Sequence, residues 1–197
     1  MANNLPATYF GPVWWYSKLL RQTGLSFPVT REGVEECIDK AETFQKQTIR
    51  NRCVIMTSQG LQKLSIPVVG SSSHHQLMAD TLISDHGNWR HQHWQSIQTA
   101  YGNAPFFEYY QDYLRPFFFD ETVIADSLAA PIVPPCRLTH LLDFNIATTS
   151  LVLSLLDIKK GTEAFLPSVP SVYCDPSSDL SILDLLFHKG PQSVLYL

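Results

Sequence analysis

An aromatic, amphipathic segment at residues 85–110 constrains the fold of this 197-residue chain more than any other stretch. At helical spacing Trp89, His93 and Ile97 fall on one face, with Tyr101 at its margin. Apolar and ionisable side chains therefore meet on the same predicted buried surface. An imidazole that faces a core or a cleft has to be hydrogen-bonded, paired or used in chemistry. We expect this helix to contribute both to the core and to any binding site.

A predicted β-hairpin precedes this segment. Its two strands are RNRCVIMT, residues 50–57, and LQKLSIPVV, residues 61–69, and the tight turn between them contains Gly60. Alternation places Arg52 on one side of the first strand and Cys53 on the other. The hairpin is the clearest strand signal in the sequence.

Weaker signals give the other expected elements: strands at 7–10 and 34–38, and helices from about residue 12, at 106–113, at 138–158 and after a cap at 178–179. Strands in the first third followed by helices predict an α/β or α+β fold, with a small N-terminal sheet packed against helices from the remainder. The irregular connections are expected at 71–75, 117–136 and 160–178. The length fits a single domain over residues 1–197, large enough to bury a substantial core.

Composition argues against several classes of partner. The net charge is −4 and the pI is about 5.9, which favours neither duplex nucleic acid nor an anionic membrane surface. The sequence has no run of about 18 apolar residues and no signal-peptide pattern at its start, so we expect a cytoplasmic protein with no membrane partner. The four cysteines are widely spaced without a CxxC pair, so we expect them to be reduced and packed.

A basic, amide-rich cluster enters the first predicted strand and comprises Lys46, Arg50, Asn51 and Arg52. Arginine offers a planar fork and lysine a mobile point charge, which suits a phosphate, sulfate or carboxylate. The sequence predicts that this cluster binds an anionic substrate. The alternative is that a local carboxylate neutralises the guanidinium groups, and the candidates are Glu35, Glu36, Asp39 and Glu42.

The helix predicted in this segment, which starts at Asp85 or Asn88 and stops at Gly102-Asn103, offers a second candidate site. On a helix His91 and His93 diverge by about 200°, so we expect no zinc or iron site. Burial beside Arg90 is expected to lower the pKa of His93 and leave it neutral and able to accept a proton. The alternative is a buried histidine that only bonds a backbone carbonyl. Trp89 and Tyr101 are candidates for packing on a sugar or nucleoside ring, and the alternative for both is core packing.

The sequence lacks other familiar catalytic patterns. It contains no GxSxG nucleophile motif and no glycine-rich phosphate loop, so side chains would have to hold a nucleotide and no cofactor is expected. A small hydrolase with Cys53 as nucleophile and His93 as base is a third, weaker hypothesis.

Several long motifs together resemble the WbqC-like protein family, in the version found in Bacteroidetes-type bacteria: ATYFGPVWWYSKLL, FQKQTIRNRC, WRHQHWQSIQTAYGNAPFFEYY and LSILDLLFHKGP. The resemblance covers nearly the whole chain. Many relatives open with a Gln-Pro pair before a Tyr-Leu-Pro turn, whereas this chain keeps only Tyr9 and Pro12 of that pattern. Matching the motifs highlights the positions already singled out: Lys46, Arg50, Asn51, Arg52, Trp89, His93 and Tyr101.

The resemblance implies a cytoplasmic role connected with modified sugars or nucleotide sugars. Members of the family are often encoded among genes for surface-polysaccharide assembly, and some are labelled as aminoacyl or glycine transferases acting on sugars. The leading hypothesis is therefore a transferase acting on a phosphorylated or nucleotide-linked sugar. The alternative is a non-catalytic binding or scaffold protein for a polysaccharide-biosynthesis enzyme. The transferase hypothesis requires the basic cluster and His93 to open into a common cleft.

Overall fold

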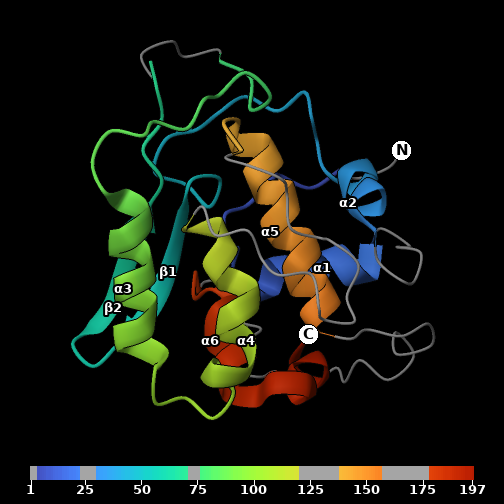
Figure 1. Ribbon diagram of the computed structural model, residues 1–197. Helices are drawn as coiled ribbons and strands as arrows, with labels where there is room; N and C mark the ends of the chain where they lie inside the picture. The colour runs from blue at the N-terminus through green and yellow to red at the C-terminus, as the bar shows by residue number, and fades with distance from the viewer. Residues whose placement is uncertain (1–3, 23–29, 71–75, 120–137, 157–177) are drawn as a thin grey trace.

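The computed structural model describes residues 4–22, 30–70, 76–119, 138–156 and 178–197. The elements in chain order are α1 (Val13–Gln22), α2 (Arg31–Cys37), β1 (Arg52–Thr57), β2 (Gly60–Ser65), α3 (Trp89–Tyr101), α4 (Phe107–Leu114), η1 (Arg115–Phe117), α5 (Leu141–Leu155), α6 (Ile182–Lys189) and η4 (Gly190–Tyr196). Figure 1 shows α3 and the hairpin at one side, with α5 and α6 in the middle and α2 at the other side. A small N-terminal sheet packed with helices confirms the predicted α+β class.

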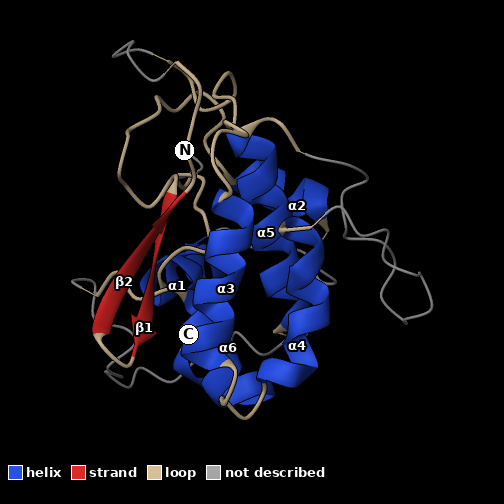
Figure 2. Ribbon diagram, turned by 60° about the vertical axis from the view of Figure 1, so that its left-hand side comes forward, coloured by secondary structure: helices blue, strands red, loops and turns tan. Residues whose placement is uncertain are grey.

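The hairpin is antiparallel, with Arg52 opposite Ser65 and Val54 opposite Lys63. The Ile66 amide donates to the carbonyl of Asn51 at 2.8 Å, which makes Arg52 and Ser65 a non-hydrogen-bonded pair. Side chains approach most closely at such pairs, while the amides and carbonyls point away from the partner strand. Figure 2 shows the hairpin lying along one side of the helices.

The outer edge of β1 is covered by two distant parts of the chain. The Ser181 amide donates to the carbonyl of Val54 at 2.8 Å, and the Met56 amide donates to the hydroxyl of Tyr101 at 3.1 Å. These bonds use backbone groups that an exposed edge strand would leave unpaired. The segment before α6 and the end of α3 therefore fix the hairpin in place.

Helix α5 lies in the centre of the core. Nearly every residue from Leu141 to Leu153 is buried, so the helix is apolar on all sides rather than on one stripe. The buried hydroxyl groups of Thr148 and Ser150 donate to carbonyls about one turn earlier, as Ser150 does to Ile146 at 2.8 Å. These two hydroxyl groups are therefore satisfied within the helix.

Three sequence expectations are wrong in detail. Residues 34–38 were expected as a strand, but residues 34–37 belong to α2, because the Thr30 side chain caps the helix by accepting from the Gly33 amide. Residues 7–10 are buried without forming a strand. Helix α6 starts later than expected, because Ser181 and not residue 178 or 179 supplies the N-cap.

The remaining elements agree with the sequence. The hairpin, α1, α3, α4 and α5 are confirmed within a few residues of their expected bounds. The expected irregular segments at 71–75, 117–136 and 160–178 lie almost wholly outside the described residues. None of the helices in the described ranges combines the length and the apolar character needed to cross a bilayer.

Candidate functional site

A cavity of about 300 Å³ opens on the face of the hairpin that carries Arg52. The neighbouring turn, the residue before α1 and the segment before α6 form its other walls. The lining residues are Pro12, Gln47, Thr48, Ile49, Arg52, Cys53, Val54, Lys63 and Asp179.

Two cations from the hairpin line this cavity. The Arg52 Nε donates to the Ser65 Oγ at 2.9 Å, which orients the guanidinium group. Lys63 is the diagonal neighbour of Arg52 across the hairpin, at a Cβ separation expected to be somewhat less than about 7–8 Å. Among the described residues, no carboxylate lies within ion-pair distance of either cation. Asp179 is the carboxylate of the cavity wall.

The turn at residues 45–51 forms a second wall of the cavity. Gln47 has a positive φ of 64°, which is uncommon for a residue other than glycine. The buried Asn51 stabilises this conformation, because its Oδ1 accepts from the Gln47 amide at 3.0 Å while its Nδ2 donates to the Ile66 carbonyl at 3.1 Å. Asn51 therefore ties the turn to the hairpin, and its predicted contact with substrate stays a prediction.

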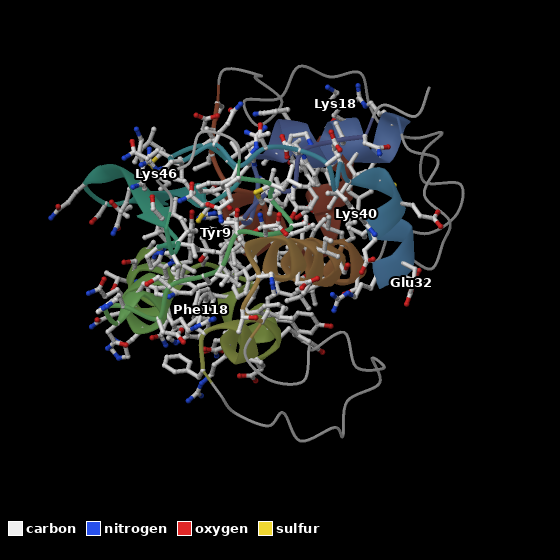
Figure 3. All side chains as sticks on the ribbon, turned by 90° about the horizontal axis from the view of Figure 1, so that it is seen from above. Tyr9, Lys18, Glu32, Lys40, Lys46 and Phe118 are labelled. Carbon is white, nitrogen blue, oxygen red and sulfur yellow. The ribbon has the colours of Figure 1, made fainter. Side chains whose placement is uncertain are left out.

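Arg50 and Lys46 do not line the cavity in the described structure. The Arg50 side chain is paired with Glu42, and both side chains are mostly buried, at 14% and 13% exposure. This is the local neutralisation that the sequence left open as an alternative. Burial raises the pKa of Glu42, even though Arg50 acts in the opposite direction. Lys46 is exposed, and Figure 3 shows it on the hairpin side of the molecule, away from Lys40.

His93 is buried, with 5% of its surface exposed. Its Nδ1 lies 2.9 Å from the Tyr9 hydroxyl, and the ring also forms a hydrogen bond with the backbone of Ser65. Burial is the main cause that lowers the pKa of His93 to about 4, so the imidazole is neutral at pH 7. The expected depressed pKa is thus confirmed, while a catalytic role stays a prediction. Within the described residues no group of three or more His, Cys, Asp or Glu side chains could hold a metal ion.

Trp89 and Tyr101 both pack in the core. The Trp89 Nε1 donates to the Ser84 carbonyl at 3.1 Å, and the Arg90 guanidinium lies 4.4 Å from its ring centroid. The Tyr101 hydroxyl accepts from the Met56 amide, and its ring lies 5.1 Å from that of Phe187. Neither residue belongs to the cavity wall, so ring stacking on a substrate stays untested.

The hairpin separates His93 from the cavity. The Gln62 side chain donates to Ser96 of α3 at 3.2 Å, which places α3 against the face opposite to that of Arg52 and Lys63. In the part of the chain that the structure describes, the common cleft expected from the sequence is therefore not formed. Arg52 reaches the cavity from one face of the hairpin, and His93 contacts the hairpin from the other.

The sequence did not reveal several residues of the cavity. Lys63, Thr48 and Asp179 were not candidates, although alternation along the second strand would place Lys63 and Ser65 on the same face as Arg52 once the register is known. Asp179 has no local signal, because it reaches the cavity only through the pairing of its segment with β1.

The thiol of Cys53 does not suit a nucleophile. The residue is 3% exposed, and burial raises the pKa of its thiol well above the usual range. A thiol with such a raised pKa is almost wholly protonated at neutral pH, whereas the thiolate is the reactive form. Cys37 is also a buried thiol, and Cys136 and Cys174 lie outside the described residues.

The depressed pKa of His93 predicts a stability loss in mild acid. The unfolded chain binds a proton near pH 6.5 and the folded chain only near pH 4, so the free energy of unfolding falls as the pH drops through this window. Between about pH 7 and about pH 5 the expected loss from this group is about 2 kcal/mol. Urea denaturation of wild type and His93→Gln across this range measures it. Parallel pH profiles of the two proteins would contradict the assignment.

Comparisons with known proteins identify the family. The chain is 37% identical over 78 residues to an uncharacterized protein of Mycobacterium tuberculosis (strain ATCC 25618 / H37Rv), named Rv1507c. This match covers 40% of the chain and 33% of the relative, which is about a third of the relative's length. No solved structure matches the chain. The model of the WbqC-like protein family matches residues 37–169, which include the hairpin and α3, and the chain therefore belongs to the WbqC-like protein family.

Proposed function

We propose that this protein binds a phosphorylated or nucleotide-linked sugar in the hairpin cavity, as a cytoplasmic transferase connected with surface-polysaccharide assembly. The single observation that supports the anionic group is the pair of cations, Arg52 and Lys63, that line the cavity without a carboxylate partner among the described residues. The link to sugars comes from the resemblance to the WbqC-like family and not from the cavity itself. We also propose that residues 1–197 form one domain.

The cavity offers more than charge to a phosphate group. Arg52 is oriented through its Nε, so its two terminal nitrogens remain to donate to phosphate oxygens in parallel. Thr48 and Ile49 line the cavity, and their amides donate to no acceptor among the described residues. Free backbone amides in a turn are frequent donors to anions. The volume of about 300 Å³ lies at the lower end of the range for small-molecule sites.

Group transfer to or from a sugar needs a proton acceptor near the reacting atoms. The sequence assigned this role to His93, but the hairpin lies between His93 and the cavity. Among the described lining residues, Asp179 carries a carboxylate that fits the role better. We therefore propose Asp179 as the acceptor and keep His93 for a supporting role.

The second candidate is a non-catalytic binding or scaffold protein. Met56 and Leu61 face each other at the end of the hairpin on the same side as Arg52 and Lys63, and they are 43% and 64% exposed. Exposed apolar side chains beside a ligand site are what a partner enzyme would cover.

The two candidates differ in turnover. If the protein is an enzyme, Asp179→Asn should abolish transfer and keep ligand binding. If it is a scaffold, purified wild type should bind sugars without turnover.

Anion binding is tested by thermal unfolding with inorganic phosphate and a panel of nucleotide sugars. We expect wild type to gain melting temperature and Arg52→Ala to weaken the affinity at least about tenfold, because a charge-assisted pair contributes about 1.5–3 kcal/mol. Arg31→Ala is the matched control, since Arg31 is paired with Glu35 and Asp143 far from the cavity. Equal ligand shifts for Arg52→Ala and wild type would refute the proposed site.

A further inference from the structure

We infer that Tyr9 and His93 are positioning residues for the cavity. Together they fix the position of the turn wall, residues 45–51, relative to the hairpin wall that carries Arg52. This inference rests on the proposed anion site. It gives a function to His93, which the sequence singled out as a possible proton acceptor, and to Tyr9, the buried residue that contacts it. Figure 3 shows Tyr9 in the interior, between the hairpin side of the molecule and α5.

Tyr9 is fully buried and forms two bonds that point in different directions. Its backbone amide donates to the carbonyl of Ile49 at 3.0 Å, and Ile49 belongs to the turn wall. Its side-chain hydroxyl lies 2.9 Å from the His93 Nδ1. One residue therefore connects the turn wall of the cavity to helix α3.

His93 continues this connection to the hairpin. A neutral imidazole donates from one nitrogen and accepts at the other. Of the Ser65 backbone groups, the carbonyl is the one that can accept the ring N–H, so the Nδ1 accepts the hydroxyl proton of Tyr9. Because Ser65 occupies a non-hydrogen-bonded pair, its carbonyl points away from β1 and is free for this bond.

Ser65 connects the hydrogen bond from His93 to the Arg52 guanidinium. Its Oγ accepts from the Arg52 Nε at 2.9 Å, on the cavity face of the hairpin. The backbone of Ser65 is thus held from α3 while its side chain holds Arg52. The chain of bonds runs from the turn wall through Tyr9, His93 and Ser65 to the guanidinium.

The hydroxyl of Tyr9 acts through the hydrogen bond that it forms with His93 and not through the volume that it fills. Phenylalanine would fill the same space and keep the backbone bond to Ile49, but it would remove the bond to the His93 Nδ1. The imidazole would then be free to turn, and its bond to Ser65 would weaken. We expect Arg52 to sample more orientations and to bind an anion less tightly.

The test compares Tyr9→Phe, Ser65→Ala and His93→Gln with a core control, Ile97→Val. Ile97 is buried on the same face of α3 and does not line the cavity, so its shortened side chain should lower stability without changing the groups that meet the anion. Two quantities are measured on each protein: the affinity for inorganic phosphate, and the exchange rate of the Arg52 Nε–H by nitrogen-15 NMR. The second quantity reports the orientation of Arg52 and does not depend on anion binding.

We expect Tyr9→Phe and Ser65→Ala to weaken phosphate binding about fivefold, the effect of one lost hydrogen bond, and to speed the Nε–H exchange. His93→Gln should stay within about twofold of wild type, since its amide can both donate and accept. Ile97→Val should bind like wild type despite its lower melting temperature.

The outcomes separate this inference from the proposed function. If Tyr9→Phe and Ser65→Ala lose stability but keep wild-type exchange and affinity while Arg52→Ala loses phosphate, the positioning role is overturned and the anion site stands. If Arg52→Ala binds phosphate like wild type, the anion site falls, and with it the role of Tyr9 and His93 in serving it.

Discussion

Replacement of Glu42 by alanine is expected to lower the free energy of unfolding by about 4 kcal/mol, the range found when one partner of a buried ion pair is removed. Arg50 would keep its charge in a site where only 14% of its side chain is exposed. The remaining acceptors of its Nη1, Gln45 and Thr48, lie at 3.3 Å and carry no charge. Urea denaturation at pH 7 measures the change.

The matched control is Glu35→Ala, because Glu35 also pairs with basic residues but at partly exposed sites, where a salt bridge contributes about 1 kcal/mol or less. A double variant, Glu42→Leu with Arg50→Met, should recover most of the loss, since it removes both charges together. If Glu42→Ala destabilises no more than Glu35→Ala, the Glu42 and Arg50 pair is solvated in solution and not buried.

Substitution of Gly190 by alanine is expected to cost about 4 kcal/mol, about half from backbone strain and half from displaced packing. Gly190 ends α6 with φ of 54° and ψ of −130°, a conformation that residues with a Cβ rarely adopt. An added Cβ would also lie 2.5 Å from the ring of Phe106, far inside van der Waals contact. Thermal and urea unfolding measure the effect.

Gly87→Ala separates the two contributions. Gly87 has φ of 76°, and an added Cβ there meets no atom within 4 Å, so only the conformational cost of about 1 kcal/mol applies. A loss at Gly190 of only about 2 kcal/mol, its backbone strain alone, would show that the Phe106 ring moves aside freely.

Much of the secondary structure follows from local signals. The turn with Gly60 and the alternating strands predicted the hairpin, and the spacing of Trp89, His93 and Ile97 predicted the buried face of α3. These elements were predictable because periodicity and turn residues act over a few neighbouring residues. Residues 34–38 were misread because the helix depends on a side-chain cap at Thr30, which outweighs a short apolar run.

The candidate site was only partly predictable. Arg52 lines the cavity as expected, but Arg50, two residues earlier, forms an ion pair with Glu42. Adjacent basic residues look alike in a sequence, and the choice between a ligand and a carboxylate depends on which segments pack beside them. Asp179 illustrates the same limit, since it is more than a hundred residues from Arg52 and meets it only where its segment pairs with β1.

The sequence by itself determined the family, the hairpin, most of the helices, and the groups able to bind an anion or move a proton, because these depend on residue type and on spacing within one element. Only the tertiary structure decided that Arg52 and His93 lie on opposite faces of the hairpin, joined through Ser65. Strand register, and the choice of the face on which α3 packs, arise from contacts between segments far apart in the chain, and no local pattern encodes them.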